Sequence, residues 1–328
     1  MARVILFGKT ACLNAGRLSR LLREDWELVE LPDDGDEARL RRELSMAQAM
    51  IGLRWRREWA EVADGLRLVQ ALGAGVDAYE VNGLPSGCAL CNVYEHGVPV
   101  AEYVVGMMVA LTVRLALADR SLRQGAWSGS GRLDGETHGE LAGRSAGLIG
   151  WGSIGREVAR RLRAFDMRVR AVRANPRADE PGDCDWIGGP ERLDELLEVS
   201  DYVVVCCPLT ESTHGMLDGA RLARLKRGAF LINVARAEIV DELALYEALR
   251  ERRLAGAALD VWYRYPADAG QQMLPASLPF GELENVIMTP HLSAWTEEMV
   301  ERRWKKIAAN LDALAEGRPL GNLVCLAD

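Results

Sequence analysis

The sequence predicts an α/β protein that contains two doubly wound parallel sheets. Short apolar runs alternate with helical runs through residues 1–98, and the same alternation starts again at Ser145. Strands that alternate with helices are typical of parallel sheets covered by helices. A chain of 328 residues is also long enough for two such domains.

In the first half, continuous apolar runs mark the strands, as expected where a parallel sheet is buried on both faces. The mostly apolar residues 100–117 predict one long helix, buried between the two halves, and the Gly- and Ser-rich segment 124–140, with Trp127 and His138, predicts a loop. The predicted strands cover residues 4–7, 26–31, 49–53 and 68–71, and the predicted helices cover residues 17–23 and 36–45.

In the second half, apolar runs of similar length again alternate with amphipathic segments. A last amphipathic helix, 297–316, ends the pattern. The predicted strands are 146–149, 169–172, 202–206, 230–233, 257–258 and 286–289, and the predicted helices are 156–162, 193–198, 219–225 and 242–250.

Composition argues against several classes of partner. The net charge of −8 disfavours a nucleic-acid surface, and the basic clusters 54–57 and 302–306 have the spacing of solvated helix faces. Residues 98–118 form the nearest approach to a membrane span, but Glu102 and Arg114 interrupt them. Seven cysteines, with one isolated C-x-x-C pair at Cys88 and Cys91, favour free thiols in a reducing cytoplasm over a metal site.

A glycine-rich turn is the most informative local feature. Gly150, Gly152 and Gly155 form G-x-G-x-x-G between a predicted strand and a predicted helix, which is the context of a dinucleotide-binding Rossmann unit. The first glycine permits a tight turn, the second lets the backbone approach a pyrophosphate, and the third lets helix and strand pack closely. Backbone N–H groups of Ser153 and Ile154 would then face the anion at the helix start. The alternative is a turn that only connects two elements.

The residues after the second strand of this unit bear on the choice of cofactor. An acidic side chain there normally binds the ribose of NAD. Here Arg173 occupies the position, Asn175 and Arg177 follow, and no carboxylate appears before Asp179. Guanidinium groups suit a 2′-phosphate, so NADP is expected in preference to NAD. The alternative is that both arginines are solvated loop charges and that the choice of cofactor is loose.

Seven motifs in order resemble the D-isomer-specific 2-hydroxyacid dehydrogenases. This family includes glyoxylate/hydroxypyruvate reductases, phosphoglycerate dehydrogenase and phosphite dehydrogenase, and the resemblance covers nearly the whole chain. Besides the glycine turn, the motifs are Gln70–Asp77, Val100–Glu102, Gly139–Gly143, Cys207–Thr213, Ile232–Arg236, Ala258–Val261 and Thr289–His291.

The resemblance implies a role for each of several residues. Arg236 would bind the substrate carboxylate and polarise its carbonyl, and His291 would be the general acid in reduction and the base in oxidation. Backbone N–H groups of Ala74 and Gly75 would bind the carboxylate, and Asp260 would hold the nicotinamide carboxamide. Positions that would line the cofactor are Cys207, Pro208, Thr213, Val234 and Ala235. Without the family context, Arg236 fits a surface ion pair and His291 a core histidine.

The resemblance also implies an architecture. A Rossmann nucleotide domain, residues 99–291, would be inserted into a flavodoxin-like substrate domain made of residues 1–98 and 292–328, with the site in the cleft. The helix after Val100 usually helps such proteins to form a homodimer.

One departure from the family pattern concerns the catalytic histidine. The family usually has a glutamate before the proline that follows the Asp-Val pair, and here Tyr265 stands in that place. Losing the carboxylate removes the partner that raises the histidine pKa. A Tyr265 hydroxyl would orient the imidazole more weakly and move the optimum for reduction to lower pH. The related formate dehydrogenases also lack this glutamate, so the departure affects the expected substrate more than the hydride transfer.

Other residues could tune the substrate. His96 would contact it at the cleft entrance, and Tyr263, Arg264 and Trp295 could add bulk or positive charge for a second anionic group, or could pack an interface. We therefore expect a cytoplasmic, NADP-preferring enzyme that reduces a glyoxylate- or hydroxypyruvate-like 2-oxoacid. One alternative is oxidation of an oxyanion or aldehyde hydrate, such as phosphite or a phosphonate. The other is a dinucleotide-sensing, corepressor-like binding protein.

Overall fold

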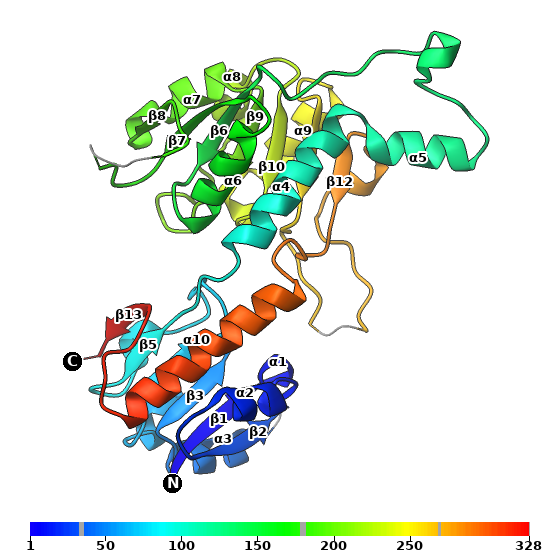
Figure 1. The fold of residues 1–328 in the computed structure, drawn as a ribbon. Coiled ribbons are helices and arrows are strands. Elements are labelled where there is room, and N and C mark those ends of the chain that lie inside the picture. The colour runs from blue at the N-terminus through cyan, green and yellow to red at the C-terminus, as the bar shows by residue number, and fades with distance from the viewer. Residues whose placement is uncertain (33–35, 178–181, 268–269, 328) are drawn as a thin grey trace. The chain divides into compact units, whose positions relative to one another are not determined.

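The protein, seen in a computed structural model, is described for residues 1–32, 36–177, 182–267 and 270–327. It divides into two compact units, each with its own sheet (Figure 1). Unit 1 contains Met1–Glu95 and Thr296–Asp328, and unit 2 contains His96–Trp295.

Unit 1 is built around a six-stranded sheet of order β13-β5-β4-β3-β1-β2, counted over the described residues. All pairings are parallel except that of β13 with β5. The parallel part follows the flavodoxin-like order 2-1-3-4-5. The strands are β1 (Ala2–Phe7), β2 (Trp26–Leu31), β3 (Ala49–Gly52), β4 (Leu68–Ala71), β5 (Ala89–Cys91) and β13 (Leu323–Leu326).

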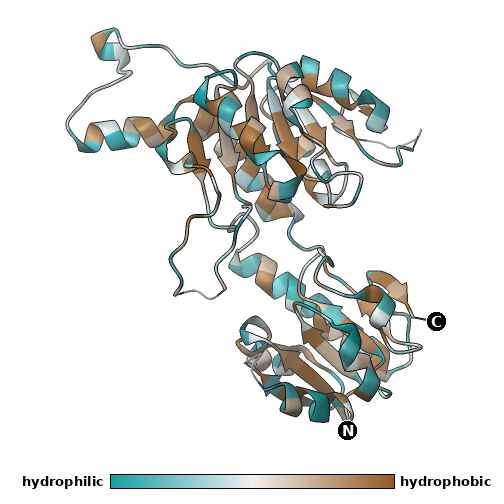
Figure 2. Cartoon of the chain, turned by 180° about the vertical axis from the view of Figure 1, so that it is seen from behind, coloured by the Kyte–Doolittle hydropathy of each residue, from teal (hydrophilic) through white to brown (hydrophobic). Residues whose placement is uncertain are grey.

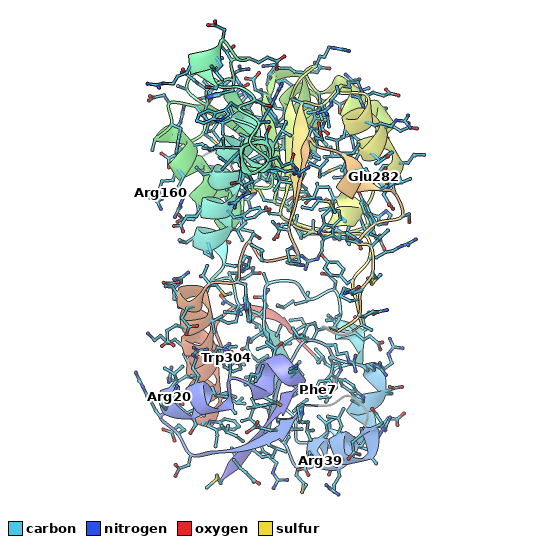
Figure 3. The ribbon with its side chains drawn as sticks, turned by 90° about the vertical axis from the view of Figure 1, so that its right-hand side faces the viewer. Phe7, Arg20, Arg39, Arg160, Glu282 and Trp304 are labelled. Atoms are coloured by element: carbon cyan, nitrogen blue, oxygen red, sulfur yellow. The ribbon has the colours of Figure 1, made fainter. Side chains whose placement is uncertain are left out.

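Helices cover both faces of this sheet because side chains alternate along each strand. Val4 and Leu6 of β1 face α1, α2 and α10, where Trp304 is buried (Figure 3). Ile5 and Phe7 face α3 and η1 on the other side. The helices are α1 (Lys9–Cys12), α2 (Ala15–Leu21), α3 (Glu37–Leu44) and α10 (Glu297–Ala315), with 3-10 turns η1 (Arg57–Val62) and η2 (Val81–Gly83).

Unit 2 contains a seven-stranded parallel sheet, again counted over the described residues, of order β12-β11-β10-β9-β6-β7-β8. Numbered within the unit, this is 7-6-5-4-1-2-3, the Rossmann order with one added strand. The predicted α/β fold class is therefore confirmed. The strands are β6 (Ser145–Ile149), β7 (Arg168–Val172), β8 (Trp186–Gly188), β9 (Tyr202–Val205), β10 (Phe230–Asn233), β11 (Gly256–Leu259) and β12 (Val286–Met288).

The helices of unit 2 also form two layers, and the apolar residues concentrate on the strands between them (Figure 2). α4 and α6 pack on one face, and α7, α8 and α9 pack on the other. The helices are α4 (Gly97–Thr112), α5 (Leu115–Arg123), α6 (Ser153–Arg163), α7 (Leu193–Val199), α8 (Gly219–Arg224) and α9 (Glu242–Arg250), with η3 (Gly131–Leu133), η4 (Pro190–Arg192), η5 (Ala237–Ile239) and η6 (Phe280–Glu282).

The expectation of one continuous helix over residues 100–117 is wrong. α4 ends at Thr112, and Arg114 has a φ of 53°, so the chain turns before α5 begins at Leu115. α4 and α5 are bent by 60° relative to each other. No single helix among the described residues has the length and apolarity to cross a membrane, and this bent pair passes that test only when its two helices are taken together.

Candidate functional site

The glycine turn lies where the strand order of unit 2 reverses, between β6 and β9. A Cβ at Gly150, whose φ is 119°, would lie 2.7 Å from the carbonyl oxygen of Cys206. A Cβ at Gly155 would lie 2.4 Å from the Gly150 oxygen, whereas one at Gly152 would meet nothing within 4 Å. Two glycines are therefore required by packing, and the third leaves open space at the start of α6. This geometry fits a dinucleotide pyrophosphate.

The loop after β9 forms the other side of this turn. The Cys206 thiol donates a hydrogen bond to the Gly150 oxygen at 3.3 Å, and burial raises the pKa of that thiol. Farther along, the Thr213 hydroxyl donates to the Pro208 oxygen at 2.8 Å and accepts from the Thr210 N–H at 2.7 Å. Thr213 thus closes the turn that begins at the partly buried Cys207. The structure thus places Cys207 beside the glycine turn, at the carboxyl end of β9, and Pro208 and Thr213 farther along the same loop.

Arg173 follows β7 at the same edge of the sheet. The Gly150 N–H donates to the Val172 oxygen at 2.9 Å, so the end of β7 adjoins the glycine turn. Arg173 is partly buried, and Asn175 and Arg177 are exposed on the segment that follows. Asp179 lies outside the described residues. Arg173 thus directly follows the strand after which a Rossmann unit holds the adenine ribose, and Asn175 and Arg177 lie on the exposed segment beyond it.

The turn after β10 is shaped by the side chain of Asn233. Its amide donates to the Arg236 oxygen at 2.9 Å, and its Oδ1 accepts the Ala235 N–H at 3.0 Å. Val234 and Ala235 are buried, and Arg236 is partly exposed. The Asn-x-x-Arg spacing therefore produces a rigid turn that presents one guanidinium at the carboxyl end of β10.

Asp260, directly after β11, accepts hydrogen bonds from the segment that contains His291. Its carboxylate accepts hydrogen bonds from the Thr289 hydroxyl at 2.6 Å and from the Leu292 and Ser293 N–H groups at 2.9 and 3.0 Å. Asp260 is 0% exposed. The sequence predicts that Asp260 holds the nicotinamide carboxamide, and this stays a prediction. In the structure the Asp260 carboxylate contacts residues 289–293, hereafter the histidine loop.

His291 lies within hydrogen-bond distance of the residue that replaces the family glutamate. The Tyr265 hydroxyl is 3.0 Å from His291 Nδ1 and accepts the Trp262 N–H at 3.1 Å. Partial burial of the imidazole lowers the pKa of His291; the Asp260 carboxylate opposes this shift, and the Arg236 guanidinium adds to it. Burial also raises the pKa of Tyr265. A neutral tyrosine therefore faces a histidine with a depressed pKa.

The remaining predicted substrate residues lie on other segments. Ala74 and Gly75 are in unit 1, in the turn after β4, where the Asn92 amide donates to the Ala74 oxygen at 2.9 Å. His96 precedes α4 in unit 2, and a Cβ at its neighbour Gly97 would lie 3.2 Å from the Ser153 oxygen of the glycine turn. Tyr263 donates to the Val240 oxygen at 2.8 Å, and Arg264 donates to the Ser277 hydroxyl at 2.7 Å.

Two supporting residues were not predicted. Trp262 donates its indole N–H to the Thr289 oxygen at 2.8 Å, and the Tyr103 hydroxyl of α4 lies 2.7 Å from the Thr289 hydroxyl. Both residues belong to apolar runs, and no motif marks them. Their roles depend on contacts 27 and 186 residues apart in sequence.

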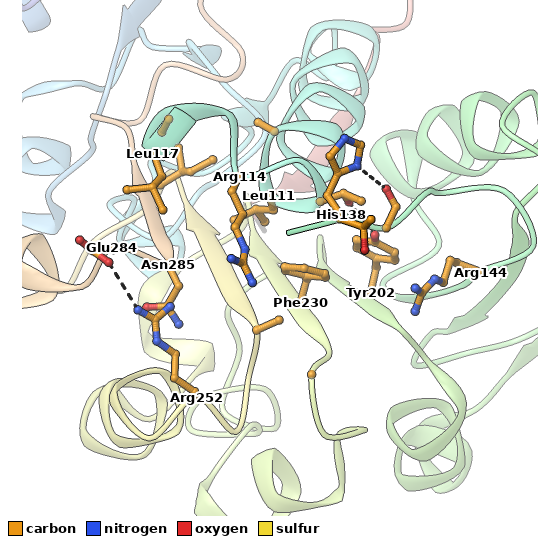
Figure 4. Close-up of a pocket in the computed structure, with 18 residues that line it drawn as sticks. Leu111, Arg114, Leu117, His138, Arg144, Tyr202, Phe230, Arg252, Glu284 and Asn285 are labelled. Atoms are coloured by element: carbon orange, nitrogen blue, oxygen red, sulfur yellow. Dashed lines mark hydrogen bonds and ion pairs between the residues drawn. The ribbon is translucent and has the colours of Figure 1, made fainter. Parts of the chain in front are cut away.

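A pocket of about 560 Å³ lies at the opposite edge of the unit 2 sheet (Figure 4). It is lined by Tyr202 and Phe230, the first residues of β9 and β10, and by Arg144, which precedes β6. Ligands of doubly wound sheets bind beyond the carboxyl ends of the strands. This pocket at the amino ends is therefore separate from the glycine turn and the histidine loop.

Comparisons with known proteins agree with this geometry. Residues 105–293 match the family described as "D-isomer specific 2-hydroxyacid dehydrogenase, NAD binding domain". A glyoxylate reductase from Korarchaeum cryptofilum is 33% identical over 270 residues, which cover 80% of this chain and 77% of that protein. For a D-3-phosphoglycerate dehydrogenase from Archaeoglobus fulgidus the identity is 32%, over 82% of this chain but 49% of the relative.

A solved structure extends the likeness to the whole fold. The D-isomer specific 2-hydroxyacid dehydrogenase from Xanthobacter autotrophicus Py2, in complex with NADPH and MES, has a TM-score of 0.78 and 27% identity. The match covers 99% of this chain and 98% of that one. The chain described here belongs to the D-isomer specific 2-hydroxyacid dehydrogenases, a family of NAD(P)-dependent oxidoreductases.

Proposed function

We propose that this protein is an NADP-preferring reductase of small 2-oxoacids of the glyoxylate or hydroxypyruvate type. The observation that carries the proposal is that Arg236 and His291 follow β10 and β12, two strands of one parallel sheet, and so lie at the same carboxyl edge as the glycine turn. A fixed cation and a titrating imidazole are what a carbonyl reduction beside a carboxylate requires.

Each group has a defined task in this proposal. The bound nicotinamide would supply the hydride to the carbonyl carbon. Arg236 would hold the carboxylate and polarise the carbonyl, and His291 would give its proton to the carbonyl oxygen as the hydroxyl forms. The Ala74 and Gly75 N–H groups and His96 would bind the substrate. Asp260 would hold the nicotinamide carboxamide and would also fix the histidine loop through its three hydrogen bonds.

The preference for NADP rests on the segment after β7. Arg173, Asn175 and Arg177 are the polar side chains there, and guanidinium groups pair with phosphate in bidentate geometry. The relative from Xanthobacter autotrophicus was solved with NADPH, so a protein of this fold holds a nucleotide with a 2′-phosphate.

The partner that we propose is a second copy of the chain. Residues 113–140, hereafter the arm, project from the body of unit 2, and α5 buries none of its residues (Figures 1 and 2). Trp127 and Leu133 of the arm are 63% and 65% exposed. Leu115 and Leu122 of α5 are also more than half exposed, so the arm gathers four exposed apolar side chains, and a C2 dimer would cover both arms.

Sedimentation of a Trp127→Ser, Leu133→Ser double variant would test the dimer. It should sediment as a monomer while wild type sediments as a dimer. Leu13→Ser, which removes a residue that is 75% exposed in unit 1, is the control and should leave the mass unchanged. A monomeric wild type would contradict the dimer.

The proposed activity is tested by NADPH and NADH oxidation with glyoxylate, hydroxypyruvate, phenylpyruvate and phosphonopyruvate. Turnover of small 2-oxoacids, faster with NADPH than with NADH, is expected. Tight cofactor binding without turnover of any of them would contradict the reductase.

One observation favours a second candidate function. A lowered His291 pKa favours the neutral imidazole. A neutral imidazole suits a base that takes a proton from the water that attacks phosphite, or from a hydroxyl of an aldehyde hydrate, as hydride leaves for the nicotinamide. Reduction of NADP by phosphite, with no turnover of 2-oxoacids, would favour this candidate.

A further inference from the structure

Tyr103 lies on α4, a helix that contacts two parts of the proposed site in unit 2. Gly97, at the start of α4, packs against Ser153 of the glycine turn. Tyr103 follows six residues later, about 9 Å along the helix axis at 1.5 Å per residue, and its hydroxyl reaches Thr289 at 2.7 Å. The single helix α4 thus contacts both the glycine turn and the histidine loop.

The direction of the hydrogen bonds follows from the number of protons. The Thr289 hydroxyl has one hydrogen, which it donates to the Asp260 carboxylate at 2.6 Å. In the Tyr103–Thr289 pair the tyrosine is therefore the donor. Burial raises the pKa of Tyr103 to about 12, so its hydroxyl keeps this proton at working pH.

Thr289 anchors the histidine loop. Its side chain lies between Tyr103 and Asp260, its N–H donates to the Leu259 oxygen at 3.0 Å, and its carbonyl accepts the Trp262 indole N–H at 2.8 Å. Two residues later, His291 has a φ of 57°, in the left-handed region. A non-glycine residue there is strained and persists only when its surroundings hold it.

We propose that Tyr103 is a positioning residue for His291, acting through the Tyr103–Thr289–Asp260 hydrogen-bond chain. These hydrogen bonds fix the histidine loop in the strained conformation that orients the imidazole. Because α4 also packs against the glycine turn, it fixes the position of the imidazole relative to that turn. The inference rests on the proposed function, since it takes His291 as the proton donor. The charged and titrating groups that face His291 are Asp260, Arg236 and Tyr265.

Tyr103→Phe keeps the ring and removes the hydroxyl. We expect kcat for the 2-oxoacid to fall on the order of tenfold, because a misplaced proton donor slows the chemical step. The Kd for NADPH should stay within about twofold, since this hydroxyl binds no part of the glycine turn. Thr289→Ser should retain the activity and Thr289→Val should lose it, which separates the hydroxyl chain from ring packing and keeps a test available if Tyr103→Phe does not fold.

Tyr202→Phe is the matched control. Tyr202 also forms a tyrosine–threonine hydroxyl pair with α4, at 2.6 Å from Thr112, but it lies at the amino end of β9, away from the histidine loop. The Tyr202→Phe protein should lose about as much folding stability as the Tyr103→Phe protein, because each loses one buried hydroxyl, but its kcat should stay at the wild-type value. An equal fall of kcat in both variants, or no fall in Tyr103→Phe, would overturn the proposal.

NMR of the histidine rings gives a readout that does not depend on turnover. The chain has four histidines, so the His291 signals can be assigned by their loss in His291→Gln. We expect Tyr103→Phe to shift or broaden the His291 ring signals and Tyr202→Phe to leave them in place. If wild type turns over no 2-oxoacid, the proposed function fails, and these signals still decide whether Tyr103 positions the ring; unchanged His291 signals in Tyr103→Phe would overturn the inference.

Discussion

The Tyr265 hydroxyl lies 3.0 Å from Nδ1 of His291 and already accepts the Trp262 N–H. The hydroxyl can therefore donate a hydrogen bond to a neutral imidazole or accept a hydrogen bond from an imidazolium. Unlike a carboxylate, it brings no negative charge, so it orients the ring while stabilising the charged form less than a carboxylate would.

The lowered pKa of His291 predicts the pH dependence of catalysis. Reduction needs the protonated imidazole, so kcat/KM for a 2-oxoacid should fall about tenfold per pH unit once the pH exceeds that pKa. Oxidation of the 2-hydroxyacid needs the neutral ring, so its rate should rise through the same pKa and then level off. Rate profiles in both directions between pH 4 and 9 would check this. A reduction rate that stays flat up to pH 8 would contradict the lowered pKa.

Tyr265→Glu would restore a carboxylate beside Nδ1. An opposite charge at this distance raises a histidine pKa by about 1–3 units, so the falling limb of the reduction profile should move to higher pH by a similar amount. Tyr265→Phe should change the profile as well, because it removes the hydroxyl that orients the ring. Tyr246→Phe on α9 is a control that should change neither profile. An unchanged profile in Tyr265→Phe would remove the role that we assign to this hydroxyl.

Arg236→Lys tests the substrate anchor. Lysine keeps the charge but loses the planar fork, so kcat/KM should fall by about 10²-fold or more while NADPH still binds. Steady-state kinetics and a fluorescence titration with NADPH would measure the two effects. Arg224→Lys, on the surface of α8, should match wild type. Retained turnover in Arg236→Lys would show that catalysis does not depend on this guanidinium, whereas a dinucleotide sensor would show NADPH binding but no turnover in either protein.

Arg173→Ala tests the choice of cofactor. Removing a guanidinium that pairs with a 2′-phosphate should raise KM for NADPH by about tenfold or more and leave KM for NADH nearly unchanged. Arg168→Ala, at the other end of β7, is the matched control. Equal losses for both cofactors would show that Arg173 does not read the 2′-phosphate.

Two glycines of the same motif should respond differently to alanine. At Gly155 the added Cβ would lie 2.4 Å from the Gly150 oxygen, so Gly155→Ala should lower thermal stability, by about 1–3 kcal/mol for such overpacking. At Gly152 the Cβ meets nothing within 4 Å, and φ is −97°. Gly152→Ala should therefore fold as wild type and bind NADPH more weakly. Thermal melts with and without NADPH would distinguish the two; normal NADPH binding by Gly152→Ala would place the pyrophosphate elsewhere.

Much of the fold could be predicted from the sequence because buried parallel strands are nearly continuous apolar runs. Residues 26–31, 68–71, 230–233 and 242–250 were predicted with the bounds that the structure has. The three-residue strands β5 and β8 were not predicted, whereas β12, equally short, was predicted because it is an uninterrupted apolar run. The break at Arg114 was also missed, because it depends on one residue adopting a positive φ inside an apolar stretch.

For the candidate site, motifs located the residues but not their supports. The glycine turn, Arg236 and His291 each follow a strand, and the carboxyl ends of parallel strands meet at one edge. The partners of Asp260 could not be predicted, because a carboxylate that binds a ligand and one that holds a loop look the same in sequence. Tyr103 reaches Thr289 across 186 residues, a pairing that only the three-dimensional packing of α4 creates.

The glycine turn has a thermodynamic consequence for cofactor binding. Gly150 is held by its N–H bond to Val172 and by the Cys206 thiol, and Gly155 packs against the Gly150 carbonyl. The turn is thus fixed by backbone packing before any nucleotide arrives, so little chain entropy is lost when one binds. Calorimetry of NADPH binding to the protein should then show a small negative heat-capacity change. That change would come from the apolar surface that the nucleotide covers and not from the folding of a loop.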